Sequence, residues 1–295
     1  MDLKYIVTNN KYQNINQVLK QEFNVSTRLQ QKIIKEQHVF LNSKIADTRS
    51  NISLNDVISV NLDFEEDSEN IISAKMELNI IYEDECFLIL NKPVGIAVHP
   101  SISHYTDSLA NGVKFYFESI GLKRKIRPIN RLDLNTSGLV IFAKNEYVQE
   151  SLIKQMQNKT FEKYYIAFVE GTFADKEGTI NLPIARKENS IIERCIAENG
   201  QTAITDYKVL SEYDNFSIVE CYLQTGRTHQ IRVHMSAIGH PLLGDTLYGN
   251  SSNLINRQAL HSYKISFIHP IIKQTMNFSC DLPDDMNSIL IQKNI

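Results

Sequence analysis

One carboxylate, Asp133, stands between an arginine and a stretch of sequence that has the pattern of a buried strand. Residues 139–144, LVIFAK, are an apolar run, which predicts a central strand covered on both faces. Residues 136–138, Thr-Ser-Gly, form the turn that leads into this strand. Asp133 is therefore expected just outside the sheet and close to a dry interior, where desolvation protonates a carboxylate unless a cation keeps it ionised. Arg131 and the arginines of a second motif are the candidate cations.

The second motif spans residues 223–249 and reads LQTGRTHQIRVHMSAIGHPLLGDTLYG. Its first arginine, Arg227, directly follows Gly226. Glycine permits a close backbone approach, and an arginine can donate two parallel hydrogen bonds to one carboxylate. Arg227 is thus suited to bind a carboxylate.

The histidines of the same motif raise the alternative of a metal-dependent hydrolase or nuclease. His229 and His234 are five residues apart, which places them on opposite faces of a strand, or about 140° apart on a helix. Neither arrangement presents both rings to one ion, and the nearest acidic residue, Asp245, lies beyond a Gly-Pro-Gly region. Structural, hydrogen-bonded histidines are the preferred interpretation, and no metal is expected.

Two further chemistries find little support in the sequence. Ser137 lacks the G-x-S-x-G surroundings of a serine nucleophile, so a turn hydroxyl that bonds to the backbone is the simpler interpretation. The chain contains neither a G-x-x-x-x-G-K-[ST] loop nor a G-x-G-x-x-G motif, and we expect no nucleotide cofactor.

Length and composition are those of a globular protein with two domains. The chain has 295 residues, of which 42% are hydrophobic and 22% charged. No signal peptide or membrane-spanning run is apparent, and the four cysteines form no CxxC pair, which favours reduced thiols in the cytoplasm. The net charge of -3 argues against a nucleic-acid partner, but residues 111–163 hold ten Lys or Arg against five Asp or Glu, a local +5. Phosphate contacts are the favoured role, over a solvated loop, for a basic cluster within them: Lys123, Arg124, Lys125 and Arg127.

Local patterns divide the chain into three parts. Residues 1–62 predict a small α/β module, with a helix that Ser26 caps from Thr27 to about Glu36. Residues 63–75 begin with DFEEDSEN and predict a flexible, self-repelling acidic linker. Residues 76–295 alternate short strands with turns and contain one clear helix after Asn145, which predicts an α+β domain with a largely antiparallel or mixed sheet.

The N-terminal module resembles the S4 RNA-binding domain. The matching stretches are the helix STRLQQKIIKE, the turn and strand HVFLNSK, and the strand that follows Asn55-Asp56. Gln37 or His38, and Ser43, stand where that family usually has glycines, which is expected to alter the turns. The resemblance implies that Arg28, Lys32 and Lys44 face RNA, although a solvated helix face would account for them equally well.

Four ordered motifs of the larger domain resemble those of the RluA-type pseudouridine synthases. They are NKPVGIAVHP at residues 91–100, NRLDLNTSG at 130–138, FEKYYIAFVEG at 161–171 and the motif that includes residues 223–249. The resemblance implies a mixed sheet with flanking helices and a central cleft. It also implies an enzyme that isomerises uridine in RNA without a cofactor or metal.

Residue roles follow from the motif positions. Asp133 would be the catalytic aspartate, and Arg131 would fill the stack that the flipped nucleotide leaves. Tyr165 would lie against the uracil ring and assist proton removal from C5, Arg227 would pair with Asp133, and Ile231 would line the base pocket. The family's His before Arg-Leu-Asp is Asn130 here, and activity is expected to survive that change.

The resemblance leaves the target RNA open. Large-subunit ribosomal RNA is the expected target because S4-bearing members of the family commonly act there, and a transfer RNA is the alternative. We expect a cytoplasmic monomer that binds RNA and no membrane. A competing hypothesis is a non-catalytic RNA-binding or ribosome-assembly factor that retains the fold.

Overall fold

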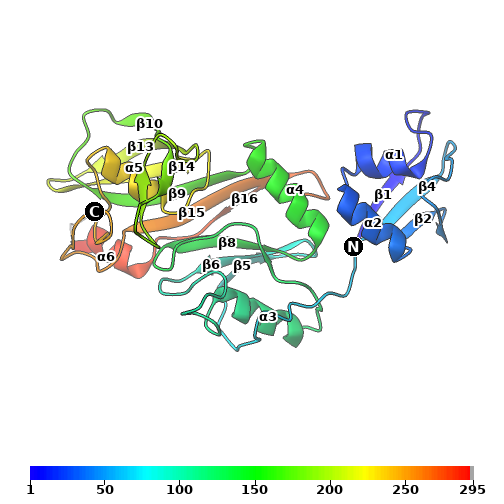
Figure 1. The fold of residues 1–295 in the computed structure, drawn as a ribbon, viewed down its shortest axis with the longest axis horizontal. Helices are drawn as coiled ribbons and strands as arrows, with labels where there is room; N and C mark the ends of the chain where they lie inside the picture. The colour runs from blue at the N-terminus through cyan, green and yellow to red at the C-terminus, as the bar shows by residue number, and fades with distance from the viewer. Residues whose placement is uncertain (293–295) are drawn as a thin grey trace.

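The strand that follows Asp133 lies at the centre of a large sheet in the computed structural model, which describes residues 1–292. The strands of this sheet and of a small hairpin are β5 (Ile80–Glu83), β6 (Phe87–Lys92), β7 (Arg127–Pro128), β8 (Ser137–Ala143), β9 (Glu162–Glu170), β10 (Glu177–Asn181), β11 (Ile184–Arg186), β12 (Arg194–Ile196), β13 (Ile204–Glu212), β14 (Phe216–Leu223), β15 (Leu260–Ile268) and β16 (Thr275–Ser279). The helices of the same part are α3 (Leu109–Ser119), α4 (Glu146–Gln157), α5 (Gln230–Ala237) and α6 (Asp284–Gln292). Figure 1 shows their arrangement.

Within residues 1–292 the large sheet has ten strands, which follow the order β10-β13-β14-β9-β15-β8-β6-β5. Strand β16 pairs with β15, β7 pairs with β8, and β11 and β12 form the separate hairpin. The pairing of β15 with β8 is parallel, and the other pairings in the sheet are antiparallel. The prediction of an α+β fold with a mixed, largely antiparallel sheet is therefore confirmed.

A glycine makes the parallel joint between the two halves of the sheet possible. Gly138 pairs with Ser262 on β15 and has a φ of +113°. A Cβ at this position would collide with the backbone carbonyl of Ser262. Residue 138 must therefore be glycine for β8 to pair with β15. This pairing fixes the start of β8 at Ser137, four residues after Asp133.

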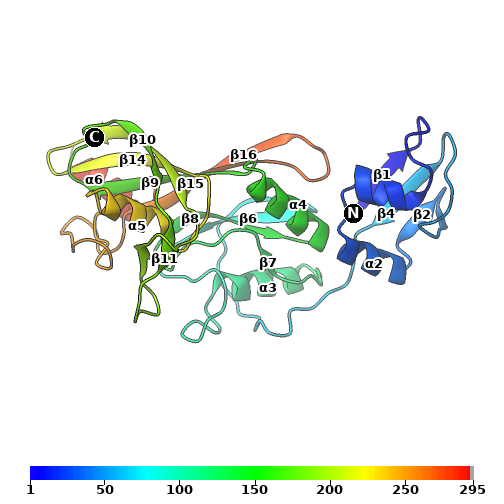
Figure 2. The ribbon, with the colours of Figure 1, turned by 45° about the horizontal axis from the view of Figure 1, so that its top comes forward.

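Two helices cover opposite faces of the β6–β8 region (Figure 2). On α4, Val148 and Leu152 are fully buried, as their helical spacing predicts, and Asn145 caps the helix by accepting a hydrogen bond from the Val148 amide at 2.9 Å. The side of the sheet that α4 covers presents Phe87, Ile89, Leu139 and Ile141. The opposite side packs against α3 through Leu88, Leu90, Val140 and Phe142. Within residues 1–292 no helix has the length and apolar character needed to cross a bilayer.

The N-terminal module contains a sheet of its own. Its elements are β1 (Asp2–Ile6), α1 (Ile15–Gln17), the π-helix η1 (Val18–Glu22), α2 (Thr27–Lys35), β2 (Val39–Leu41), β3 (Lys44–Ile45) and β4 (Val57–Asn61). The strands pair antiparallel in the order β1-β4-β2-β3. The predicted helix and the two predicted strands are present, and Ser26 caps α2 by accepting a hydrogen bond from the Leu29 amide at 3.2 Å. Strand β1 was missed because its sequence alternates only briefly.

Two turns of this module adopt a backbone conformation that glycine usually provides. Gln37 has a φ of +59° and Ser43 a φ of +65°. The missing glycines therefore do not move these residues out of the left-handed region, contrary to the expectation that the turns would be altered. The cost is strain of about 1–2 kcal/mol per residue, since a Cβ crowds the following carbonyl in this region.

The acidic segment after β4 is bound to the rest of the chain, so the expectation of a flexible, self-repelling linker is wrong. Glu66 is held by Arg127 at 2.8 Å and by Lys32 at 2.7 Å. Asp63 pairs with Arg124 at 2.6 Å, and Phe64 is buried and stacks on His38. Two further pairs join the segment to the larger domain, Glu65 with Lys123 and Asp67 with Lys114. The basic residues supply the charge that prevents self-repulsion.

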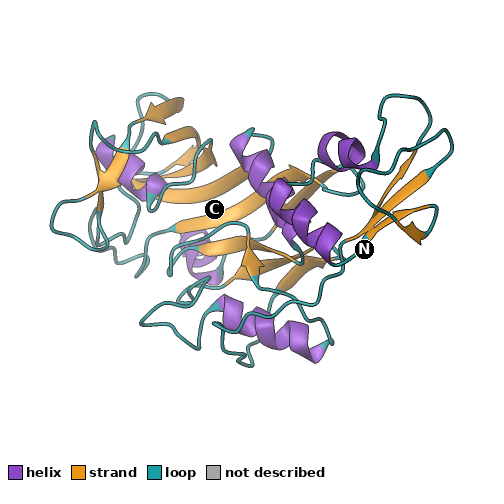
Figure 3. Ribbon diagram, turned by 45° about the vertical axis from the view of Figure 1, so that its right-hand side comes forward, coloured by secondary structure: helices purple, strands orange, loops and turns teal. Residues whose placement is uncertain are grey.

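The N-terminal module packs against α4, which lies between it and the large sheet (Figure 3). The Ser26 hydroxyl donates a hydrogen bond to Glu150 at 2.6 Å, and Lys154 donates one to the backbone carbonyl of Asn24 at 2.9 Å. Arg28 pairs with Glu146 at 3.5 Å. The N-terminal end of α2 therefore meets a carboxylate from α4, which also suits the positive end of the helix dipole.

Candidate active site

A cavity of about 990 Å³ opens beside the loop that precedes β8. Its walls come from this loop, from β9, from the loop after β14 and from the first turn of α5. Five residues that the sequence predicts for the site line it together: Arg131, Asp133, Tyr165, Arg227 and Ile231. Residues nearly 100 positions apart in the chain thus share one cleft.

Asp133 is held in place by a turn and by one arginine. Its backbone carbonyl accepts a hydrogen bond from the Thr136 amide at 3.0 Å, which closes the turn into β8. Its side chain is about one quarter exposed, and Oδ2 accepts a hydrogen bond from Nη1 of Arg232 at 3.3 Å. His229 approaches the same oxygen to 3.8 Å, although burial lowers the pKa of this histidine despite the neighbouring carboxylate.

The cation beside Asp133 is Arg232 and not Arg227, which corrects the predicted pairing. Arg227 is exposed, and it donates hydrogen bonds to the Thr202 carbonyl and to the Gln201 side chain, both at 3.0 Å. The reason lies in the backbone, since His229 takes a left-handed conformation with a φ of +58° and starts α5 immediately afterwards. Helix α5 then carries Arg232 inward, whereas Arg227 stays in the loop.

Arg232 joins two carboxylates. Its Nε and Nη2 donate to the two oxygens of Asp245 at 2.7 and 2.8 Å, and the remaining Nη1 faces Asp133. Asp245 is 1% exposed and Arg232 is 7% exposed, so this fork is fixed inside the protein. The motif GRTHQIR contains two arginines that could pair with Asp133. The sequence alone did not show which of them points inward.

Tyr165 and Ile231 form an apolar wall of the cavity. They are 5% and 3% exposed. Burial and the nearby Asp133 carboxylate raise the pKa of Tyr165 to about 12. The phenol therefore stays protonated near neutral pH, which suits packing against a ring and donating a hydrogen bond better than accepting a proton.

Arg131 lies at the open side of the cavity. It is exposed, and no ion pair or hydrogen bond involves its side chain within residues 1–292. His99 lies nearby, and burial together with the Arg131 charge lowers the pKa of that histidine. A cationic side chain without a protein partner beside the cleft is available to a ligand.

A lysine that the sequence prediction did not include holds the loop that carries Asp133 through a hydrogen bond to Leu134. Lys92 is fully buried and donates three hydrogen bonds to backbone carbonyls: to Pro93 and Ile96 at 2.8 Å, and to Leu134 at 3.0 Å. Burial and the charge of Arg257 lower its pKa to about 7, although the Asp133 carboxylate opposes this shift. The signal was a lysine at the end of the apolar strand sequence FLILNK.

Asn130, where the sequence departs from the family motif, has a structural role. Strand β15 pairs with β8 at Ser137 and Gly138, and further along β8 the Asn130 side chain takes the place of a strand partner. It donates to the Leu139 carbonyl at 2.9 Å and accepts from the Ile141 amide at 3.0 Å. Its buried amide therefore anchors the loop that carries Asp133 to the sheet.

Side chains of the histidine motif that could bind a metal already form hydrogen bonds or ion pairs within the protein, so they do not fit a metal site. His234 is fully buried, with its ring nitrogens 2.9 Å from the Thr205 hydroxyl and the Leu182 carbonyl. Asp245 belongs to the fork with Arg232. The alternative nucleophile Ser137 is buried and bonded to His261 at 2.9 Å, away from the cavity.

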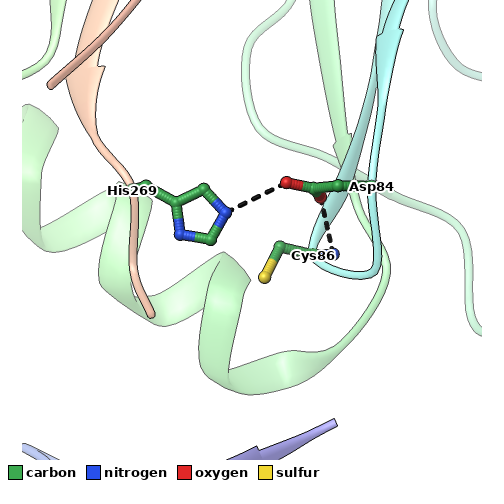
Figure 4. A group of neighbouring side chains, drawn as sticks. All are labelled: Asp84, Cys86 and His269. Carbon is green, nitrogen blue, oxygen red and sulfur yellow. Dashed lines mark hydrogen bonds and ion pairs between the residues drawn. The ribbon is translucent and has the colours of Figure 1, made fainter. Parts of the chain in front are cut away.

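A second group of possible metal ligands lies elsewhere, formed by Asp84, Cys86 and His269 (Figure 4). Nδ1 of His269 accepts hydrogen bonds from the amides of Ile271 and Ile272, so the ring proton is on Nε2, which donates to Asp84 at 3.0 Å. Burial raises the pKa of Cys86 to about 12, so its thiol stays protonated. No lone pair of the ring is left for an ion, and we interpret the group as structural.

The seven basic residues predicted to face RNA do not line the cavity within the described chain. Five of them are paired with carboxylates: Arg28, Lys32, Lys123, Arg124 and Arg127. Arg127 is 6% exposed and belongs to the interior. Lys44 and Lys125 are exposed, and within residues 1–292 neither forms an ion pair.

Comparison with known proteins agrees with this geometry. The family described as RNA pseudouridylate synthase matches residues 86–237, slightly more than half of the chain. An uncharacterized RNA pseudouridine synthase of Bacillus subtilis (strain 168), YjbO, is 41% identical over 239 residues, which cover 81% of this chain and 84% of that protein. The ribosomal large subunit pseudouridine synthase D of Neisseria meningitidis (serogroup A) is 35% identical and covers 87% of this chain and 72% of its own. Among solved structures, human RNA pseudouridylate synthase domain containing 1 superposes with a TM-score of 0.59 at 27% identity, over 72% of this chain and 87% of that one.

Proposed function

Because the chain belongs to the RNA pseudouridylate synthase family and isomerises uridine in RNA, we propose that Asp133 is the nucleophile of the reaction. The observation that carries this assignment is the position of its carboxylate. Asp133 lies in a cleft, partly exposed, with the buried Arg232 bonded to the oxygen Oδ2. A carboxylate must be anionic and aimed to attack a sugar or base, and a fixed guanidinium provides both conditions.

The other residues of the cleft fit the steps before and after attack. The target base is stacked in RNA and must be extruded, which costs a few kcal/mol. The planar, unpaired guanidinium of Arg131 at the rim suits the space that the base vacates. Tyr165 and Ile231 then provide an apolar wall against which the uracil ring can turn without rigid hydrogen bonds. Arg232 takes the role of the partner of Asp133, and Arg227, which is exposed and bonded to Thr202 and Gln201, lies at the rim, where it can meet RNA.

We propose large-subunit ribosomal RNA as the target, with transfer RNA as the alternative. Support comes from relatives, since proteins named ribosomal large subunit pseudouridine synthase D are 34–37% identical to this chain. We also propose that residues 1–62 act as an S4-like RNA-binding module, residues 63–75 as its connection, and residues 76–295 as the catalytic domain. Lys44 and Lys125 are the exposed basic residues left for phosphate contacts. The protein is proposed to act as a cytoplasmic monomer, and its four free cysteines suit a reducing compartment.

A map of pseudouridines in total RNA tests the function and the target together. Cells that lack the protein should lose one or more pseudouridines in large-subunit ribosomal RNA. The wild-type gene should restore them, and an Asp133→Asn gene should not. If Asp133→Asn restores every site, Asp133 is not the nucleophile, and if the lost sites lie in transfer RNA, the target is corrected.

A further inference from the structure

Three lysines are buried in the described part of the chain, and one of them has no partner. Lys92 donates to three carbonyls, and Lys144 pairs with Glu83 at 2.7 Å. Lys163, on β9, is 9% exposed, and within residues 1–292 its ammonium forms neither a hydrogen bond nor an ion pair. A buried ammonium without a partner is costly, so the fold tolerates this one for a reason other than stability.

The ammonium of Lys163 points into the active-site cleft. Lys163 and Tyr165 are two residues apart on β9, so their side chains leave the same face of the sheet, and both line the cavity. A Cβ placed on Gly226 would come within 3.2 Å of the Lys163 nitrogen, which locates the ammonium below the loop that carries Arg227. Burial alone lowers the pKa of Lys163 to about 8, with no compensating carboxylate. The missing anion must therefore come from a ligand.

The isomerisation generates such an anion on the base. When the bond between N1 and C1′ breaks, its electron pair leaves with the uracil and spreads over O2 and O4. If the carboxylate adds to C6 first, negative charge develops on O4 instead. C5 then bonds to C1′ and loses its proton to a base, while N1 gains a proton, so the product is an isomer. Both routes place charge on a uracil oxygen in a dry cleft, where a fixed cation stabilises it most.

We propose that Lys163 is a catalytic residue that binds the uracil oxygen on which negative charge develops. This inference rests on the proposed function and deepens it. Asp133 and Lys163 line the same cleft, and within residues 1–292 the two side chains do not pair, so the carboxylate and the ammonium can act on different atoms of one nucleotide. Turning uracil about its C6–N3 axis exchanges N1 with C5 and also exchanges O2 with O4. One ammonium can therefore hold an equivalent oxygen before and after the turn without changing its place.

The test compares Lys163→Met, Lys163→Gln and Lys163→Arg with the wild type. The substrate is large-subunit ribosomal RNA transcribed in vitro, at enzyme excess, and the product nucleoside is measured by mass spectrometry after digestion. Lys163→Met and Lys163→Gln are expected to slow the reaction on bound RNA by about 10²- to 10³-fold, as for loss of one charge-stabilising donor, with unchanged RNA affinity. Lys163→Arg, which keeps the charge, should lose less. Lys264→Met on the neighbouring strand, whose ammonium lies over the Tyr164 ring, is the matched control and should behave as wild type.

A second substrate separates an anion on the base from a phosphate of the backbone. RNA that contains 5-fluorouridine has a less basic leaving group, so the loss in Lys163→Met should be smaller when cleavage of the fluorinated nucleoside is measured. An equal loss on both substrates, a loss of affinity at unchanged rate, or no loss at all would overturn the proposal. Thermal melting should show Lys163→Met at least as stable as wild type. If the wild-type protein forms no pseudouridine in this RNA, the proposed target is at fault, and the comparison is repeated on total RNA.

Discussion

Replacing Arg232 by lysine tests whether the site needs the geometry of a guanidinium or only a positive charge. Arg232 uses three nitrogens, two for Asp245 and one for Asp133, whereas a lysine ammonium is a point charge that cannot span all three oxygens. In Arg232→Lys the ammonium is expected to stay with the buried Asp245, because leaving that carboxylate unpaired costs more than releasing the partly exposed Asp133.

The size of the effect follows from the contact that is lost. A hydrogen bond to a charged group contributes about 1.5–3 kcal/mol. If this energy is realised in the transition state, the rate on bound RNA should fall about 10- to 150-fold, at 1.36 kcal/mol per tenfold. The free energy of unfolding should fall by less than the about 3–5 kcal/mol expected when a buried ion pair loses one partner completely.

The assay is single-turnover formation of pseudouridine at saturating enzyme, with thermal melting measured on the same preparations. Arg227→Lys is the matched control, since it makes the same substitution in the same motif but at the exposed rim. It should leave the rate on bound RNA close to wild type and change only the affinity. The reasoning is refuted if Arg227→Lys slows the bound reaction more than Arg232→Lys does.

Three other substitutions test separate parts of the site. Asp133→Asn should abolish pseudouridine formation and leave the melting temperature nearly unchanged, since its side chain makes one 3.3 Å hydrogen bond; residual turnover at wild-type rate would exclude it as nucleophile. Asn130→Ala should lower the free energy of unfolding by about 1–3 kcal/mol in urea titrations, because it leaves buried backbone groups of β8 unpaired. An unchanged free energy of unfolding would mean that water replaces the Asn130 amide as the partner of these groups. The kcat/KM of the wild type should fall as pH rises through about 8, where Lys163 loses its proton, and Lys163→Arg should move that fall to higher pH. Tyr165, with a pKa near 12, does not titrate in this window, so an unchanged profile in Lys163→Arg would contradict the requirement for a cation.

The fold class and the position of Asp133 were predictable because their signals are local, whereas the cleft was implied by the resemblance to a family. The apolar run of β8 predicted a buried strand, and residues 139–143 are fully buried, whereas the close approach of Gly138 to β15 became visible only in the structure. The same run placed Asp133 at the edge of the sheet. Such short-range patterns predict the structure well, because the alternation of side chains along a strand does not depend on which strands pair with it.

The partner of Asp133 could not be predicted because it depends on one dihedral angle. Arg227 and Arg232 share a motif and carry the same group, and the left-handed backbone of His229 decides which of them helix α5 turns inward. A residue with a positive φ that is not glycine leaves no reliable mark in the sequence. Lys92 and Lys163 were missed for a different reason, because a lysine in a strand sequence is indistinguishable from a surface lysine until the neighbouring strands bury it.

The bound acidic segment reconciles an acidic protein with an RNA substrate. Residues 63–67 neutralise much of the basic cluster that the sequence suggested for phosphate contacts. The cleft is lined by three arginines and two lysines but one carboxylate, Asp133, although the charge of Arg232 is shared with the buried Asp245. These charges favour the approach of an RNA strand to the place where a base must be extruded. The net charge of -3 is a sum over the whole chain, and it does not describe the charge of this cleft.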